Sequence, residues 1–217
     1  MEILFERALF AGAHLDDVEF GCGASVARWA TQGRDMHFLT LTKKNRNAAG
    51  EVQIVRDLNE PIQAARSLGL TKENVSIEDL DGQVLQYQAQ AVREVFLNWR
   101  RDFDPEIVFV PASNDIHQDH QVVYEEAMRI FRERTVIGFE IVRSSLSFRP
   151  NLFVEVGRDD LEKKAKSILS YRSQLEQSAG YYFNSDLIKG QARFRGGQCG
   201  KGLAEAFEVY CMQWETA

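Results

Sequence analysis

The strongest constraint on the fold is a repeated alternation of short apolar runs with longer segments of helical spacing. The runs ALFAGA (8–13) and EIVFVPA (106–112) have the length of a strand and a nearly continuous apolar centre, as in a parallel sheet covered on both faces. Between such runs, as in 84–103, apolar residues recur at helical intervals. This order predicts an α/β fold: a single-domain, Rossmann-like three-layer sandwich with a mostly parallel sheet, formed by residues 1–217 as one domain.

The pattern gives approximate bounds for each element. Pro61 falls inside one helical segment, where it would kink the helix or mark a new start, and Asp81-Gly82 predicts a turn. Residues 178–202 lack a clear period, and 206–214 fit either a closing strand or a short helix. We expect strands at 8–13, 36–42, 75–80, 106–112, 135–142 and 152–156, and helices at 25–33, 52–70, 84–103, 119–134 and 159–175.

Charge and composition exclude some classes of partner. The chain has 26 Lys and Arg against 32 Asp and Glu, a net charge of −6, which argues against binding to nucleic acid or to an anionic membrane surface. No stretch approaches the 18 or so apolar residues of a membrane span. The first residues lack a basic start and an uninterrupted apolar core, so we expect no signal peptide, and the three cysteines fit free thiols in a reducing cytoplasm.

Histidines and carboxylates follow two of the expected strands. His14-Leu15-Asp16-Asp17 comes directly after the strand 8–13, and a second group, 114–120, follows the strand 106–112. Three of the four histidines lie in these two groups, whereas His37 opens a strand and is expected to be structural. Open parallel sheets bind ligands at the carboxyl ends of their strands, so both groups are placed where a site would form.

Imidazole and carboxylate together are typical ligands of a catalytic zinc ion, which keeps three protein ligands and one water. We expect one Zn²⁺ held by His14, Asp17 and His120, because a cation offsets the repulsion between the adjacent aspartates. Asp16 would then accept a proton from the activated water. A protonated His117, paired with Asp119, would stabilise an oxyanion and serve as an acid toward a leaving amine.

Each motif alone has a simpler interpretation. An HxxD loop can be a capping or core-edge feature, and Asp119 could cap a helix that carries two exposed histidines. Asp115 could orient His117 or cap a turn. Both motifs together, each after a strand, favour a metal site.

The segment AHLDDVEFGCG, followed about a hundred residues later by HQDH, resembles the LmbE-like (PIG-L) family of zinc-dependent N-deacetylases, whose usual motifs are AHPDD and HxDH. ARSLGL (65–70) with Asp81-Gly82, and YRSQ (171–174), RFRGGQ (193–198) and AEAFEV (204–209), extend the resemblance over the chain. Leu15 stands where the family usually has proline, which removes a rigid φ but no ligand. Matched by motif, the resemblance implies metal ligands at His14, Asp17 and His120, a general base at Asp16, and an oxyanion-stabilising pair at His117 and Asp119.

The resemblance implies a hydrolase that removes acetyl from an N-acetylglucosamine-type sugar, free or in a phosphate- or nucleotide-linked conjugate, and the cysteines favour a cytoplasmic location. Arg193 or Arg195 is a candidate to bind such an anionic group, since arginine pairs bidentately with phosphate and carboxylate. A homo-oligomer is compatible with the sequence. Two rivals remain: a metal-dependent phosphoesterase, and a catalytically idle sugar- or nucleotide-binding module. The glycines at 21 and 23 are expected to serve close packing rather than phosphate binding.

Overall fold

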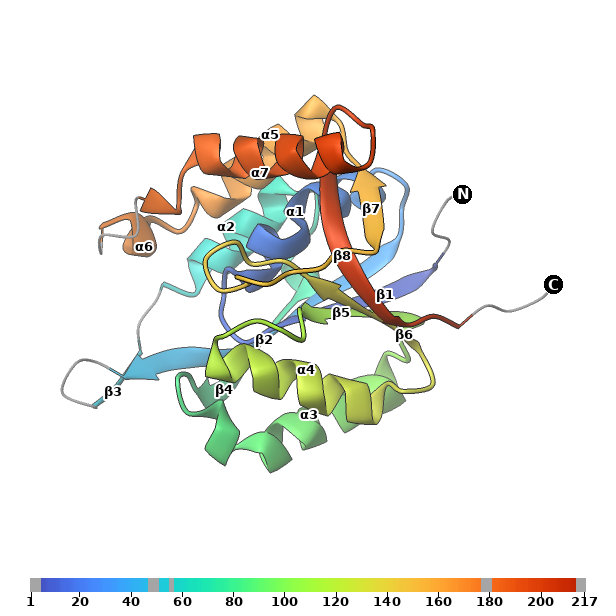
Figure 1. Ribbon diagram of the computed structural model, residues 1–217. Helices are drawn as coiled ribbons and strands as arrows, with labels where there is room; N and C mark the ends of the chain where they lie inside the picture. The colour runs from blue at the N-terminus through green and yellow to red at the C-terminus, as the bar shows by residue number, and fades with distance from the viewer. Residues whose placement is uncertain (1–4, 47–50, 55–56, 177–180, 214–217) are drawn as a thin grey trace.

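A computed structural model describes residues 5–46, 51–54, 57–176 and 181–213. Its sheet has the order β3-β2-β1-β5-β6-β8-β7, with β4 paired to β2 (Figure 1). The pairs β1–β2, β1–β5, β5–β6 and β2–β4 are parallel, and the pairs that involve β3, β7 and β8 are antiparallel. The strands are β1 Arg7–Gly12, β2 Asp35–Arg46, β3 Val52–Ile54, β4 Val75–Asp81, β5 Ile107–Pro111, β6 Thr135–Phe139, β7 Leu152–Glu155 and β8 Ala204–Cys211.

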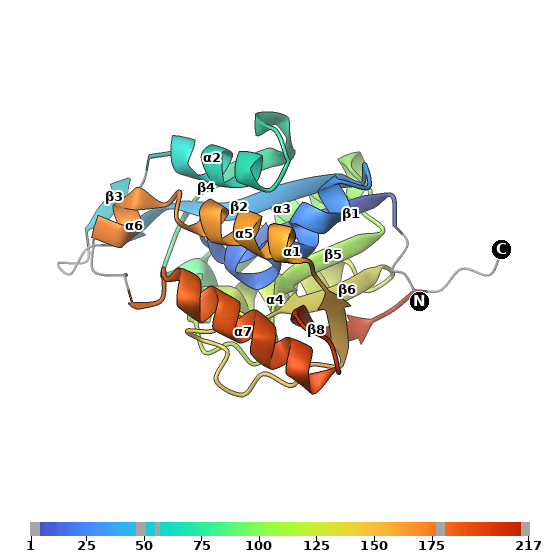
Figure 2. The same ribbon diagram turned by 90° about the horizontal axis from the view of Figure 1, so that it is seen from above.

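Helices cover both faces of the sheet. In Figures 1 and 2, α1, α2, α5 and α7 lie on one face, and α3 and α4 lie on the other. Along β1, Phe10 is buried on the first face and Leu9 on the second, as the alternation of a strand requires. The expected Rossmann-like sandwich with a mostly parallel sheet is confirmed. The helices are α1 Asp17–Ala30, α2 Asn59–Ser67, α3 Ala89–Asp102, α4 Gln118–Ile130, α5 Arg158–Ile168, α6 Arg172–Glu176 and α7 Ser185–Gln198, with short 3-10 turns η1 Lys72–Asn74 and η2 Leu85–Tyr87.

The single helix expected at 52–70 is wrong. Residues 52–54 form β3, which pairs with the end of β2, and α2 begins only at Asn59. Pro61 lies in the first turn of α2, where a missing backbone N–H leaves no helical hydrogen bond unmade. Of the two alternatives for this proline, the new start is correct. Gly69, with φ +95°, follows the helix as its expected stop signal.

Helix α1 begins eight residues before its expected start and contains a kink. Cys22 has non-helical angles, φ −146° and ψ 19°, and the backbone N–H groups of Ala24 and Ser25 donate to the carboxylate of Glu205, at 3.1 and 2.6 Å. Glu205 therefore caps the second half of α1 from β8. The start expected at residue 25 is close to the start of this second half. The first half of the helix, which carries Asp17, was not predicted.

A buried lysine completes the kink. Lys164 of α5 donates to Glu205 Oε1 at 2.6 Å and to the carbonyl oxygen of Phe20 at 2.7 Å. Gly21 is required here, because a Cβ atom would come within 2.2 Å of the ring of Phe139. The prediction that the glycines of this segment serve close packing is thus confirmed.

Helix α7 was not expected, because residues 178–202 lack an apolar period. The helix starts at a capping residue, Asn184, whose side chain accepts from the backbone N–H of Asp186 at 2.8 Å. Its glycines obscured the helical pattern. At Gly196 a Cβ atom would meet the carbonyl oxygen of Lys201 at 2.8 Å, so packing against the following turn requires a glycine inside the helix.

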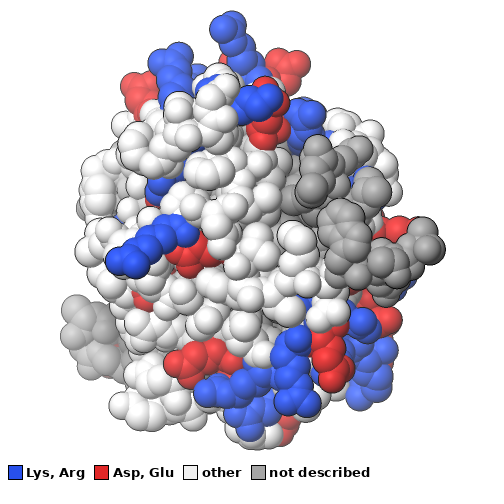
Figure 3. Space-filling view, turned by 45° about the vertical axis from the view of Figure 1, so that its right-hand side comes forward, with Lys and Arg blue, Asp and Glu red and all other residues white. Residues whose placement is uncertain are grey.

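The remaining differences are at element ends. The expected helix 159–175 is divided into α5 and α6, and for 206–214 the strand alternative is correct as far as Cys211; residue 214 lies outside the described residues. None of the helices in the described part of the chain has the length and apolar character to cross a bilayer. On the face drawn in Figure 3, lysine and arginine side chains are interspersed with aspartate and glutamate around a largely uncharged centre.

Candidate active site

The two histidine-containing motifs meet because β1 and β5 are adjacent parallel strands. The chain leaves β1 at Gly12 and turns through His14 into α1, and it leaves β5 at Pro111 and reaches α4 at Gln118. The ring of His14 lies 4.7 Å from that of His117 and 5.2 Å from that of His120, between centroids. Loops about a hundred residues apart thus form one cluster at the carboxyl ends of the strands, as expected.

Three atoms of this cluster form a nearly equilateral triangle. His14 Nδ1 lies 3.2 Å from His120 Nε2, His120 Nε2 lies 3.3 Å from Asp17 Oδ2, and Asp17 Oδ2 lies 3.5 Å from His14 Nδ1. A tetrahedral zinc ion with bonds of about 2.0 Å needs ligand atoms roughly 3.3 Å apart. The expected donor set, His14, Asp17 and His120, therefore fits a zinc-sized ion.

A second set overlaps with the first. His14, His117 and His120 can each present one nitrogen so that these atoms lie within 4.8 Å of one another. His117 Nδ1, however, accepts a hydrogen bond from the backbone N–H of Asp119 at 3.2 Å. This bond caps α4 and leaves the ring's proton on Nε2, which makes that nitrogen an N–H donor.

Each histidine of the triangle has a carboxylate at its other ring nitrogen. Asp119 Oδ2 lies 3.1 Å from His14 Nε2, and Asp115 Oδ2 lies 3.0 Å from His120 Nδ1. Such outer carboxylates fix the ring orientation of metal ligands. The expected partnership of Asp119 with the ring of His117 is not what the structure shows, because the Asp119 side chain faces His14 and accepts from the backbone N–H groups of Gln83 and Leu85.

The carboxylates make the site favourable for positive charge. Burial opposes protonation of His14 and His120, but Asp17, Asp119 and Asp115 outweigh it and raise the pKa of His14 to about 9 and that of His120 to about 10. Burial also opposes ionisation of Asp17, yet His120 and His14 hold its pKa well below the usual value. A cation at this position would take the place of these protons.

His117 differs from the other two histidines. Burial first, and then the neighbouring charges of His14 and His120, lower its pKa to about 4. The expectation of a protonated His117 is therefore not supported by its surroundings. A ring with this pKa is neutral near pH 7.

Asp16 lies at the start of α1, next to Asp17 in the chain, and is 6% exposed. Its carbonyl oxygen accepts the backbone N–H of Phe20 at 3.1 Å, which places the residue at the first turn of the helix. The structure thus brings together five expected residues, His14, Asp17, His117, Asp119 and His120, and places Asp16 next to Asp17 at the start of α1.

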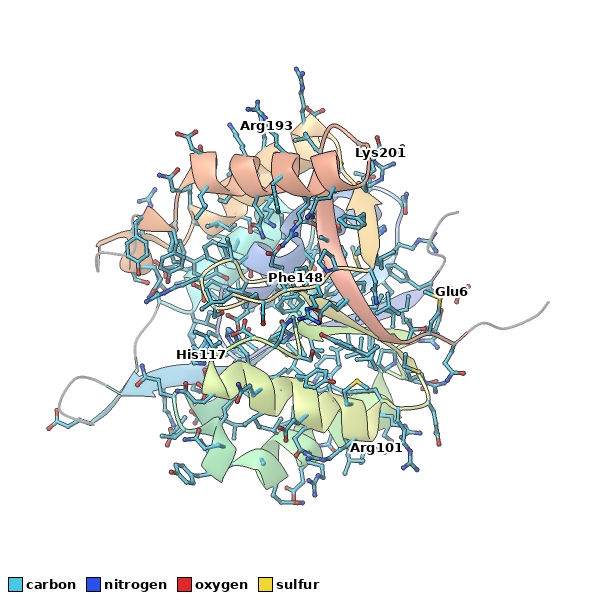
Figure 4. All side chains as sticks on the ribbon, viewed as in Figure 1. Glu6, Arg101, His117, Phe148, Arg193 and Lys201 are labelled. Carbon is cyan, nitrogen blue, oxygen red and sulfur yellow. The ribbon has the colours of Figure 1, made fainter. Side chains whose placement is uncertain are left out.

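The two expected substrate-binding arginines are placed elsewhere. Arg195 is buried and bidentate to Glu140, through Nε at 2.9 Å and through Nη2, and its Nη1 donates to Gln198 at 2.8 Å. Arg193 is exposed on the outer side of α7, whereas His117 lies at the start of α4 across the sheet (Figure 4). The structure brings neither arginine to the histidine cluster.

Sequence reasoning left the role of Asp115 open. Besides His120, the Asp115 carboxylate accepts from the hydroxyls of Ser144 and Ser145, at 2.7 and 3.2 Å, and from the backbone N–H of His117 at 2.9 Å. It therefore connects the segment after β6 to both histidines of the HxDH motif. The only signal in the sequence was its position two residues before His117.

Glu19 and Tyr171 were also not assigned to the site. Tyr171 is fully buried, its hydroxyl donates to the carbonyl oxygen of Leu15, and its oxygen lies 2.8 Å from Glu19 Oε1. Burial raises the pKa of Glu19 to about 8, so at neutral pH it is a carboxylic acid that can donate to the phenol oxygen. A phenol has one proton, and this arrangement satisfies both contacts.

Comparison with known proteins decides the family. The PIG-L family, described as GlcNAc-PI de-N-acetylase, matches residues 9–131, more than half of the chain and both motifs of the cluster. The chain belongs to the PIG-L family. It is 30% identical over 170 residues to the "Uncharacterized deacetylase YaiS" of Escherichia coli (strain K12), covering 76% of this chain and 90% of that one.

Solved structures show the same fold in proteins of different activity. The N,N'-diacetylchitobiose deacetylase from Pyrococcus horikoshii superposes with a TM-score of 0.71 at 18% identity, over 94% of this chain and 84% of the other. GalB, the 4-carboxy-2-hydroxymuconate hydratase from Pseudomonas putida KT2440, superposes with a TM-score of 0.74 at 19% identity, over 98% and 99%. The fold therefore permits more than one reaction, and the function has to be argued from the site.

Proposed function

We propose that the protein is a metal-dependent amidohydrolase that removes the N-acetyl group from an N-acetylglucosamine-type amino sugar or its conjugate, with one Zn²⁺ as cofactor. The observation that carries this proposal is the triangle of His14 Nδ1, His120 Nε2 and Asp17 Oδ2, with sides of 3.2–3.5 Å. Membership of a family of deacetylases supports the reaction class. Zinc bound there supplies a Lewis acid for the acetyl carbonyl and lowers the pKa of water from about 15.7 to roughly 7.

Asp16 is proposed as the general base. It lies beside the ligand Asp17, is buried, and accepts the proton of the water that attacks the acetyl carbonyl carbon. The Nε2–H group of His117 donates to the oxygen of the tetrahedral intermediate, because its Nδ1 is occupied by the backbone N–H of Asp119. Its position beside His14, 4.7 Å between ring centroids, supports this role.

Collapse of the intermediate breaks the C–N bond and yields acetate and a free amine. The leaving nitrogen takes up the proton that Asp16 accepted from the water, since an unprotonated amide anion is a very poor leaving group. Neutral His117 keeps its Nε2 proton. Asp119 and Asp115 orient the rings of the metal ligands. Their carboxylate oxygens lie 3.1 Å from His14 Nε2 and 3.0 Å from His120 Nδ1, respectively.

An amine-release assay tests the proposal. N-acetylglucosamine, its 1-phosphate and its nucleotide conjugate would each be offered to the wild-type protein, to the protein stripped with a chelator and reloaded with zinc, and to Asp16→Asn. We expect chelation to abolish amine release, zinc to restore it, and Asp16→Asn to lower kcat by about 10²–10⁴-fold. Asp159→Asn, an exposed aspartate at the start of α5, is the matched control.

The rivals give different results in this assay. A phosphoesterase would release phosphate or nucleotide rather than amine from the conjugates, and a two-metal version would bind more than one ion per chain. An idle binding module would bind the sugars without releasing either product. Full amine release by the stripped protein or by Asp16→Asn would contradict the proposal. A cytoplasmic location, a homo-oligomer and the absence of a nucleic-acid partner stay predictions.

A further inference from the structure

The segment YRSQ (171–174), which follows α5, takes no part in the proposed chemistry, yet it contacts the metal loop, here defined as residues 13–17. The hydroxyl of Tyr171 donates to the carbonyl oxygen of Leu15, which lies between His14 and Asp17 in the chain. The tyrosine is fully buried, and so is Leu15, at 3% exposure. This contact therefore joins elements 156 residues apart in the interior of the protein.

A second anchor holds the loop on the other side of His14. The carbonyl oxygen of Ala13 accepts from the backbone N–H of Thr42, at 3.0 Å, and from its hydroxyl, at 2.8 Å. Within the loop, the backbone N–H of His14 donates to Asp17 Oδ2 at 2.8 Å. The backbone of His14 is thus held from β2 on one side and from Tyr171 on the other.

This arrangement matters because position 15 carries a leucine. A leucine does not fix its own φ angle as proline does, so the path of the loop depends on contacts from outside it. Without the anchor at Leu15, the relative positions of His14 Nδ1 and Asp17 Oδ2, 3.5 Å apart, would be less well defined.

We propose that Tyr171 is a positioning residue for the metal site: its hydroxyl fixes the carbonyl of Leu15 and thereby pre-organises His14 and Asp17 to bind Zn²⁺. The inference rests on the proposed function in one respect, since it takes these two residues as ligands. It predicts an effect on metal affinity that does not require the substrate to be known.

The test is a Zn²⁺ titration of the purified, metal-free protein against a chromophoric chelator, for wild type, Tyr171→Phe and Ser173→Ala. Phenylalanine keeps the ring in its contact with Phe183, 6.5 Å between centroids, and removes only the hydroxyl. Ser173→Ala is the matched control, because it removes the hydroxyl hydrogen bond to Glu60 at 2.6 Å from the same segment without touching Leu15.

We expect Tyr171→Phe to weaken zinc binding about tenfold, the lower end of the range for residues that orient metal ligands, and Ser173→Ala to leave it unchanged. Thermal unfolding in chelator shows that both variants are folded and measures any structural cost separately from affinity. Equal zinc affinity in wild type and Tyr171→Phe would overturn this inference and leave the proposed function intact. A wild-type protein that binds no zinc would overturn both, and an equal loss in Ser173→Ala would reduce Tyr171 to a general structural role.

Discussion

Replacing Lys164 with methionine is expected to destabilise the protein by about 3–5 kcal/mol, because it leaves a buried carboxylate without its cation. Lys164 is 3% exposed and Glu205 is 5% exposed, and their charged atoms lie 2.6 Å apart. In the variant, Glu205 would keep only the N–H groups of Ala24 and Ser25. The carbonyl of Phe20, which the kink of α1 removes from the helix, would lose its donor as well.

Thermal unfolding of the metal-free protein measures this cost. At about 2–4 °C per kcal/mol for a chain of this size, the midpoint should fall by roughly 6–20 °C. Lys166→Met, an exposed lysine of the same helix, is the control and should change stability by less than about 0.5 kcal/mol. Adding Glu205→Gln to Lys164→Met should recover part of the loss, since the amide carries no charge and its oxygen can still accept from one of the two backbone N–H groups of Ala24 and Ser25. A loss in Lys164→Met no larger than that in Lys166→Met would show that the buried ion pair contributes no such stability.

Two further predictions concern the metal and pH. Asp115→Asn should weaken zinc binding about 10–100-fold, because the amide is uncharged and has one acceptor oxygen where the carboxylate has two. It cannot accept from the backbone N–H of His117 and also serve the serine hydroxyls and the ring of His120. Equilibrium dialysis checks this, with Asp186→Asn on the surface as control, and unchanged affinity would contradict it. Burial lowers the pKa of His37 to about 4, so the folded state favours the neutral ring. The unfolded chain takes up this proton at a higher pH, near 6.5, so the contribution of His37 to the free energy of unfolding is present above about pH 6.5 and is lost as the pH falls toward 4. Urea unfolding should therefore show a smaller loss of stability between pH 6.5 and 4 in His37→Gln than in the wild type, and identical slopes would argue against the effect.

Most of the sheet could be predicted because its central strands, β1, β5 and β6, are buried on both faces. Residues such as those of β5 are all buried, and an apolar run bounded by polar loops is a clear signal for this environment. The same pattern placed His14 and His117 at the ends of adjacent strands. Features whose conformation depends on residues elsewhere in the chain were not predicted. The kink in α1 needs Glu205 from β8, and the glycine inside α7 needs the turn after it.

In the candidate site, too, the residue types were predictable from the sequence and their contacts were not. The types and spacing of His14, Asp17 and His120 were sufficient to predict a donor set, since zinc chemistry restricts both. The partners of the ring nitrogens were not predictable in this way: Asp119 faces His14 across the site, and the carboxylate at His120 belongs to Asp115. Arg195 was expected to bind substrate because it lies in a glycine-rich, basic segment. In the structure it pairs with Glu140, 55 residues away, a contact that could not be predicted from the sequence.

X-ray absorption at the zinc K-edge of the loaded protein reports the number and type of the metal ligands. We expect one zinc per chain, with two imidazole ligands and oxygen ligands at about 2.0–2.1 Å, and the loss of one imidazole contribution in either His14→Ala or His120→Ala. A spectrum with a sulfur ligand, or one that both substitutions leave unchanged, would contradict the proposed ligand set.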